Sequence, residues 1–136
     1  MLAVRRHNMP TRLLSYLLAL LVWPLGAAAE TPSVEGPALE DCSVGPITRT
    51  YGSTPWLVYA CSDGKSVAAV APSDSPAAPF YFMIYPKDGA YELVGEGTGP
   101  KSVTDGAYAE MAQFTEQDIT DLIAAAKKQA TEGGSQ

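Results

Sequence analysis

Two cysteines and one histidine are the side chains in this sequence best suited to nucleophilic or metal chemistry. Cys42 and Cys61 are the only cysteines, and His7 is the only histidine. A reactive thiol needs a cation or a helix N-terminus nearby to lower its pKa, but Cys61 is close to Asp63 in a stretch typical of a strand. Two thiolates alone would be an incomplete metal site. The remaining interpretation is a structural disulfide, which depends on the compartment in which the protein resides.

The first 29 residues have the pattern of a cleavable export signal. Three arginines precede an apolar run at 13–25, and small residues follow it. This arrangement is typical of a signal peptide, and Ala27 and Ala29 predict cleavage between Ala29 and Glu30. The run is shorter than the roughly 20 residues of a membrane-spanning helix, so we favour cleavage over retention as an anchor. Export leads to an oxidising compartment, and we therefore predict a Cys42–Cys61 disulfide that stabilises the fold by about 3 kcal/mol.

The predicted mature chain, residues 30–136, is acidic and contains no histidine. Six basic and 15 acidic residues give it a net charge of −9, which would repel nucleic acid and anionic lipid and attract a basic partner. The absence of histidine excludes Ser–His–Asp and Cys–His catalysis and histidine-ligated metal sites. We predict a mobile segment at 30–41, a single domain at 42–130 with neither cofactor nor metal, no membrane span after cleavage, and a disordered tail at 131–136.

Carboxylates and glycines supply three weaker candidate sites. Glu92 and Glu96 lie on one predicted strand, about 13 Å apart, which exceeds the roughly 5–9.5 Å of glycosidase pairs. Asp118 and Asp121 are too few for a calcium site. The stretch GEGTGPK lacks the spacing of a phosphate-binding loop, and its glycines indicate a flexible exit from the sheet. We interpret it as a candidate recognition loop that comprises Gly95, Glu96, Gly97, Thr98, Gly99 and Lys101.

The apolar pattern predicts an α+β fold, with a C-terminal amphipathic helix packed on one face of an antiparallel sheet of four to five strands. The turn Asp63-Gly64 predicts a hairpin that places Tyr59 opposite Ala68. A second hairpin turn is expected at Pro86–Gly89, and turn residues also occupy 52–55. The expected strands are 47–51, 56–62, 65–71, 80–85 and 90–96.

Helical patterns are confined to the last third of the chain. Thr115 is a candidate N-cap, and Asp118 at the third helical position completes a variant of the capping box. The residues that follow with helical spacing are Ile119, Leu122, Ile123, Ala126 and Ala130. A short helix is also expected at 104–112, weakened by Gly106.

The aromatic side chains of the strands form the candidate binding surface. The strand at 80–85 is apolar on both faces, whereas one helix covers only one face of a sheet. The N-terminal segment, a second subunit or a partner would have to cover the other face. Tyrosine and tryptophan are favoured at interfaces, although burial in the core is an alternative interpretation for them. The proposed surface comprises Trp56, Tyr59, Tyr81, Met83, Tyr85 and Tyr91.

The stretch YACSDGKSVAAV at 59–70 is similar to part of the small periplasmic inhibitors of C-type lysozyme. Those antiparallel barrels also combine a Y-x-C-x-x-G stretch with one disulfide. Their S-G-x-x-Y inhibitory loop is absent from this chain, and the predicted C-terminal helix is not theirs, so the resemblance carries over no functional residue. It does imply one way in which an acidic exported domain can act on a basic enzyme.

These observations predict a small, non-catalytic binding or interaction protein of the bacterial periplasm or exterior. Its partner would be a protein, a peptide or a glycan, and its charge favours a basic protein. One alternative is a self-associating envelope component whose aromatic face pairs with itself. The other is a histidine-independent enzyme, which would need a pocket where Lys65 or Lys101 converges with Glu96.

Overall fold

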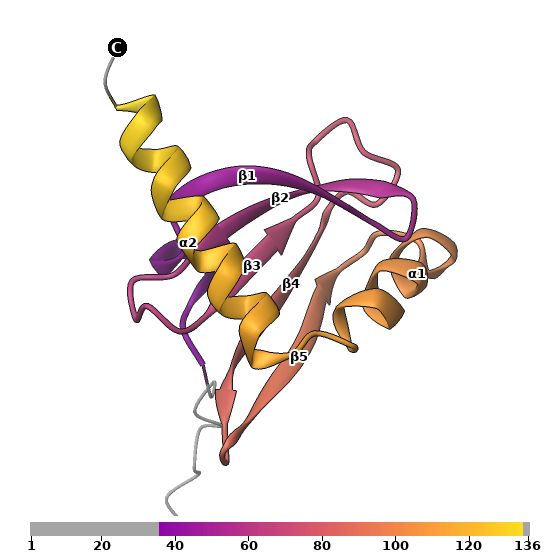
Figure 1. The fold of residues 1–136 in the computed structure, drawn as a ribbon. Coiled ribbons are helices and arrows are strands. Elements are labelled where there is room, and N and C mark those ends of the chain that lie inside the picture. Colours follow the sequence, from indigo (N-terminus) through magenta and orange to yellow (C-terminus); the bar gives the residue numbers. More distant parts are fainter. Residues whose placement is uncertain (1–35, 135–136) are drawn as a thin grey trace, which may run out of the picture. The chain divides into compact units, whose positions relative to one another are not determined.

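The structure, a computed structural model, describes residues 36–134 (Figure 1). The predicted signal peptide, its cleavage site and residues 30–35 of the predicted mobile segment lie outside the described residues. None of the helices within 36–134 is both long enough and apolar enough to cross a membrane.

The predicted α+β fold is confirmed, and its antiparallel sheet has five strands. Each strand pairs with the next one along the chain, so the spatial order is β1-β2-β3-β4-β5 and β1 and β5 form the two edges. The strands are β1 (Val44–Tyr51), β2 (Thr54–Ala60), β3 (Val67–Val70), β4 (Phe80–Lys87) and β5 (Ala90–Gly97).

Two of the connections are tight two-residue turns. Gly52 and Ser53 join β1 to β2 with φ of 59° and 61°, and Asp88 and Gly89 join β4 to β5 with φ of 50° and 79°. Two successive positive φ values give the twist that antiparallel strands need. Because Lys87 pairs with Ala90, the second turn is shorter than the predicted one, and β4 continues past residue 85.

The hairpin between β2 and β3 has the predicted register, with Tyr59 opposite Ala68. β2 ends two residues before the expected end and β3 begins two residues after the expected start, so residues 61–66 connect them. The Asp63 carboxylate accepts hydrogen bonds from the backbone amides of Lys65 and Ser66 at 2.8 and 2.9 Å. This side-chain cap satisfies amides that would otherwise extend the strand pairing, so a wider turn replaces the two-residue one.

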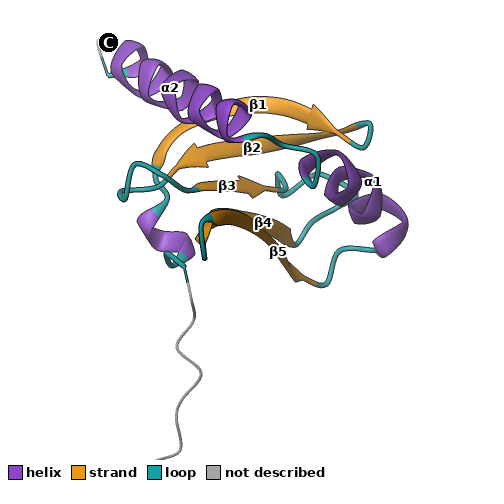
Figure 2. Ribbon diagram, turned by 60° about the horizontal axis from the view of Figure 1, so that its bottom comes forward, coloured by secondary structure: helices purple, strands orange, loops and turns teal. Residues whose placement is uncertain are grey.

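Both helices, α1 (Lys101–Met111) and α2 (Glu116–Gly133), lie on the same side of the sheet (Figure 2). The predicted capping box is present, since Thr115 Oγ1 accepts from the Asp118 amide at 3.2 Å and Asp118 Oδ2 accepts from the Thr115 amide at 2.7 Å. Helix α1 begins three residues before the predicted start. Helix α2 extends through residues 131–133, which the sequence assigns to the disordered tail.

The main core lies between the sheet and the two helices. Trp56, Val58 and Ala60 face this side of β2, and Phe82 and Ile84 face it on β4, as the strand alternation predicts. The Trp56 and Phe82 rings meet at 5.1 Å between centroids. Helix α2 contributes Ile119, Leu122, Ile123 and Ala126, and α1 contributes Ala107 and Met111.

Candidate functional site

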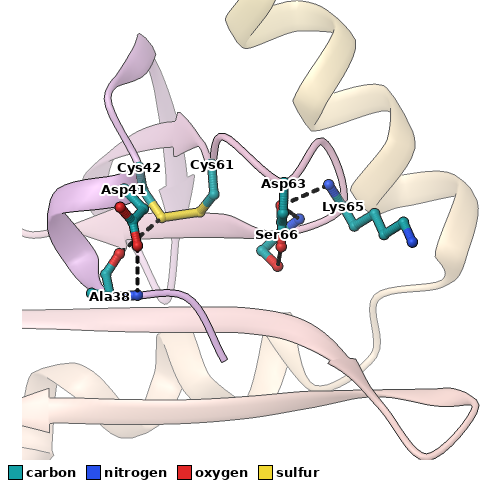
Figure 3. Close-up of a disulfide and its surroundings, with 7 residues drawn as sticks. All are labelled: Ala38, Asp41, Cys42, Cys61, Asp63, Lys65 and Ser66. Carbon is teal, nitrogen blue, oxygen red and sulfur yellow. Dashed lines mark hydrogen bonds between the residues drawn. A yellow bond between two sulfur atoms is a disulfide. The ribbon is translucent and has the colours of Figure 1, made fainter. Parts of the chain in front are cut away.

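The open face of the sheet, opposite the helices, is partly covered by the chain's own N-terminal segment. The predicted Cys42–Cys61 disulfide is present (Figure 3), and the Ser62 amide donates to the Asp41 carbonyl at 2.9 Å. Residues 36–42, of which Leu39–Asp41 form a 3-10 turn, are thereby fixed against β4. Met83 and Tyr85 are left only 4% and 7% exposed, so this end of the open face is already occupied.

The six predicted binding residues do not form one surface. Tyr59 and Tyr81 are half-buried on the open face beside Met83 and Tyr85. Tyr91 lies on the helix side of β5. Trp56 is completely buried on the helix side, and its indole N–H donates to the Tyr51 carbonyl at 3.2 Å. Trp56 is therefore a core residue, because the even-numbered positions of β2 face the helices.

Tyr81 and Glu96 form the polar part of the open face. Their strands place them side by side, and the Tyr81 hydroxyl donates to Glu96 Oε2 at 2.6 Å. This hydrogen bond, together with burial and the charges of Glu96 and Glu40, raises the pKa of Tyr81. A hollow of about 380 Å³ adjoins the pair. Its lining is Pro37, Ala38, Leu39, Glu40, Tyr81, Met83, Tyr85, Val94 and Glu96.

The predicted recognition loop is packed against residues 77–80. A Cβ at Gly97, whose φ is +135°, would lie 2.3 Å from the Pro79 carbonyl oxygen, and one at Gly99 would lie 1.9 Å from that of Ala77. The Thr98 amide donates to the Pro79 carbonyl at 3.0 Å. Gly95 in turn leaves room for the Phe80 ring. Close backbone approach, which the sequence cannot show, explains glycines that the sequence suggests are flexible.

The carboxylate and lysine pairs considered for catalysis are not brought together. Glu92 is paired with Lys87 at 2.8 Å, and Glu96 hydrogen bonds to Tyr81. No hydrogen bond or ion pair joins Lys101 to Glu96 within the described part of the chain. Lys65 lines a groove on the helix side, whereas Glu96 lines the hollow on the open face.

That groove, of about 780 Å³, is the larger concavity and was not predicted. It arises because α2 packs on β1, β2 and β3 but leaves the β4–β5 hairpin uncovered (Figure 1). One stripe of α2, with Glu116 and Lys127 at its ends, forms a wall. Helical spacing in the sequence shows that these residues share one side of α2, but it does not show how far that side lies from the β4–β5 hairpin. The lining is Gly64, Lys65, Pro86, Gly89, Ala90, Tyr91, Glu116, Thr120, Ile123, Ala124 and Lys127.

The groove combines apolar surface with unpaired cations. Neither Lys65 nor Lys127 forms an ion pair with a described residue, and Lys65 extends from its turn toward α2 (Figure 3). Burial, and then the carboxylates of Glu116 and Asp63, raise the pKa of Tyr91. The Tyr91 hydroxyl is therefore protonated at neutral pH and can donate a hydrogen bond.

Within residues 36–134, no three histidine, cysteine or acidic side chains cluster in a way that could hold a metal ion. Comparisons with protein-family models, curated proteins and solved structures found no match to this chain.

Proposed function

We propose that this chain is a small, exported, non-catalytic binding protein, and that the groove between α2 and the β4–β5 hairpin binds a short peptide. The observation that carries the proposal is the groove itself. Its volume of about 780 Å³ lies within the roughly 300–1,000 Å³ of ligand sites, which combine apolar walls with a few placed polar groups. The Cys42–Cys61 disulfide and the signal-like N-terminus support export.

The charges of the groove favour a ligand with one negatively charged end and one positively charged end. Glu116 and Lys127 are 11 helical residues apart, which corresponds to about 16 Å along α2. An extended peptide spans this length in about five residues. In the proposed complex its terminal carboxylate meets Lys127, with Lys65 as the second cation, and its amino terminus meets Glu116. Apolar side chains of the peptide pack on Ile123 and Tyr91.

Two adjacent lysines of α2 provide the test and its control. Lys127 lines the groove, whereas Lys128 does not line it and lies 3.9 Å from Glu132. We expect five-residue peptides with a free carboxylate to perturb the NMR signals of Tyr91 and Ile123. The Lys127→Gln variant should bind at least about tenfold more weakly, as for the loss of a hydrogen bond between charged groups. Lys128→Gln should bind like the parent chain.

The same titration can refute the proposal. Amidated peptides lack the terminal charge. The parent chain should bind them about as weakly as the Lys127→Gln variant binds peptides with a free carboxylate. If a mixed library of five-residue peptides leaves the groove signals unchanged, the peptide assignment fails. If amidated and free peptides bind equally, the lysines do not recognise a carboxylate.

A further inference from the structure

Strand β5 has an unpaired outer edge that runs along its whole length. It is the last strand of the sheet and pairs only with β4. Because the turn at 88–89 has two residues, Lys87 and Ala90 form a hydrogen-bonded pair. The pairing then alternates, so the backbone groups of Tyr91, Leu93 and Gly95 point away from β4. None of these groups has a hydrogen bond to another described residue.

Two hollows flank the outer edge. A hollow of about 520 Å³ contains Tyr91, Leu93 and Tyr108 on the helix side, and its lining also includes Lys87, Asp88, Glu92 and Ala112. Tyr108 is the one large hydrophobic side chain in residues 36–134 that is exposed, at 48%. On the open face the hollow of about 380 Å³ contains Val94 and Glu96. Gly95 has no side chain to shield the edge.

These two hollows match the alternating side chains of an added strand. A residue hydrogen-bonded to Leu93 would direct its side chain to the helix side, toward Tyr108. The next residue would direct its side chain to the open face, beside Val94 and Glu96. A peptide with alternating apolar and basic residues would thus place apolar groups over Leu93 and Tyr108 and cations beside Glu96.

The charge of the open face selects the occupant. Glu96 accepts from the Tyr81 hydroxyl and has no cation partner among the described residues, and Glu40 lines the same hollow. A second copy of this chain is a poor occupant, because pairing β5 with itself would gather the Glu92 and Glu96 carboxylates of both copies on one face. Like charges at facing or diagonal positions destabilise strand pairing.

We infer that the β5 edge binds an extended segment of a basic partner protein by strand addition, with basic residues over Glu96 and apolar residues over Leu93 and Tyr108. This surface shares Tyr91 with the proposed peptide groove between α2 and the hairpin but is otherwise lined by different residues. It uses internal backbone and side chains of the ligand rather than a terminal carboxylate.

The test uses the full chain and a short peptide of alternating lysine and valine, acetylated and amidated so that it carries no terminal charge. NMR-detected hydrogen exchange should show that binding slows exchange at the Leu93 and Gly95 amides. The Val94 amide, which faces β4, is protected with or without the peptide. A peptide methylated on the amides that face β5 should lose binding, and one of alternating glutamate and valine should not bind.

A matched pair of protein variants tests the charge. Glu96→Gln keeps an acceptor for Tyr81 and should weaken binding about three- to fivefold, as for one exposed ion pair. Glu132→Gln, on the far end of α2, should leave binding unchanged. Binding without protection at Leu93 and Gly95 would overturn strand addition, as would no binding at all. Protection already present in the free protein and lost on dilution would show self-pairing and also overturn the assignment.

Discussion

The backbone amide of Gly52 donates a hydrogen bond to Glu110 Oε1 at 2.9 Å, across 58 residues of sequence. This bond ties the turn between β1 and β2 to α1. The two backbones are unusually close here, because a Cβ at Gly52 would lie 2.4 Å from the Ala107 nitrogen. Gly106 faces the same contact. The position of α1 therefore depends on two glycines meeting side by side.

The contact can be tested by comparing the stability that is lost when Gly52 is replaced with the stability that is lost when Gly64, another glycine in a left-handed conformation, is replaced. Gly52→Ala adds a clash with α1 to the cost of a positive φ, and we expect it to destabilise the fold by about 2–4 kcal/mol. Gly64 has a similar φ of +69° but open space around it, so Gly64→Ala should cost about 1 kcal/mol. Urea unfolding of both variants measures the difference. Equal losses would show that backbone strain alone, and not contact with α1, requires Gly52.

Removing the disulfide should loosen the cover of the open face as well as lower stability. The double variant Cys42→Ala, Cys61→Ala should lose about 3 kcal/mol in urea unfolding, as for a closed loop of about 20 residues. Because the disulfide fixes residues 36–42 over Met83 and Tyr85, the variant should also bind a hydrophobic dye more strongly while it is folded. An unchanged dye signal in the folded variant would mean that these residues stay in place without the disulfide.

Asp63 should make stability depend on pH in the acid range. Partial burial alone would raise its pKa, but hydrogen bonds from the Ser66 hydroxyl and from the Lys65 and Ser66 amides outweigh burial and lower the pKa. A lowered pKa means that the ionised form stabilises the fold. This contribution is complete above the unfolded-state pKa of about 3.9 and is lost as the pH falls through the folded-state value.

The Asp63→Asn variant isolates that contribution. Its free energy of unfolding at pH 6 should be lower than that of the parent chain by about 1 kcal/mol, as for an exposed turn. This difference in free energy should become smaller as the pH approaches 2. Thermal unfolding at both values is the measurement. Asp74→Asn, in the exposed connection before β4, is the control, and the prediction fails if the two variants show the same pH dependence.

The capping box of α2 should contribute to stability through one side chain. Thr115→Ala removes the acceptor of the Asp118 amide and should cost about 1 kcal/mol. Thr120→Ala, one turn into the same helix, removes only a bond to the Glu116 carbonyl and replaces a β-branched residue with a better helix former. We expect no loss of stability from it. Comparable losses in the two variants would contradict a specific capping role.

Short-range signals predicted the parts of this fold that depend on neighbouring residues. The register of Tyr59 with Ala68, the alternation along β4 and the cap at Thr115 each follow from turn chemistry or periodicity. The Cys42–Cys61 disulfide followed from the cysteine count and the expected compartment. These inferences need no knowledge of which distant elements meet.

The candidate binding surfaces could not be predicted in this way, because they depend on which distant elements meet. Trp56 has the residue type of an interface anchor but lies in the core, because its strand position faces the helices. Gly95, Gly97 and Gly99 suggest flexibility but allow close packing against residues 77–80. The groove under α2 depends on the angle at which the helix crosses the sheet, which no local pattern encodes. The burial of Met83 and Tyr85 likewise depends on where residues 36–42 fold back.

Helix α2, the last element among residues 36–134, packs mainly on β1 and β2, the first two strands. During synthesis, which proceeds from the N-terminus, Trp56 and Val58 therefore stay exposed until Ile119–Ala126 have also been made. The main core therefore closes only after α2 has been synthesised. The fold thus closes its main core through contacts between the first two strands and the final helix of the described domain, which makes these contacts highly non-local in sequence.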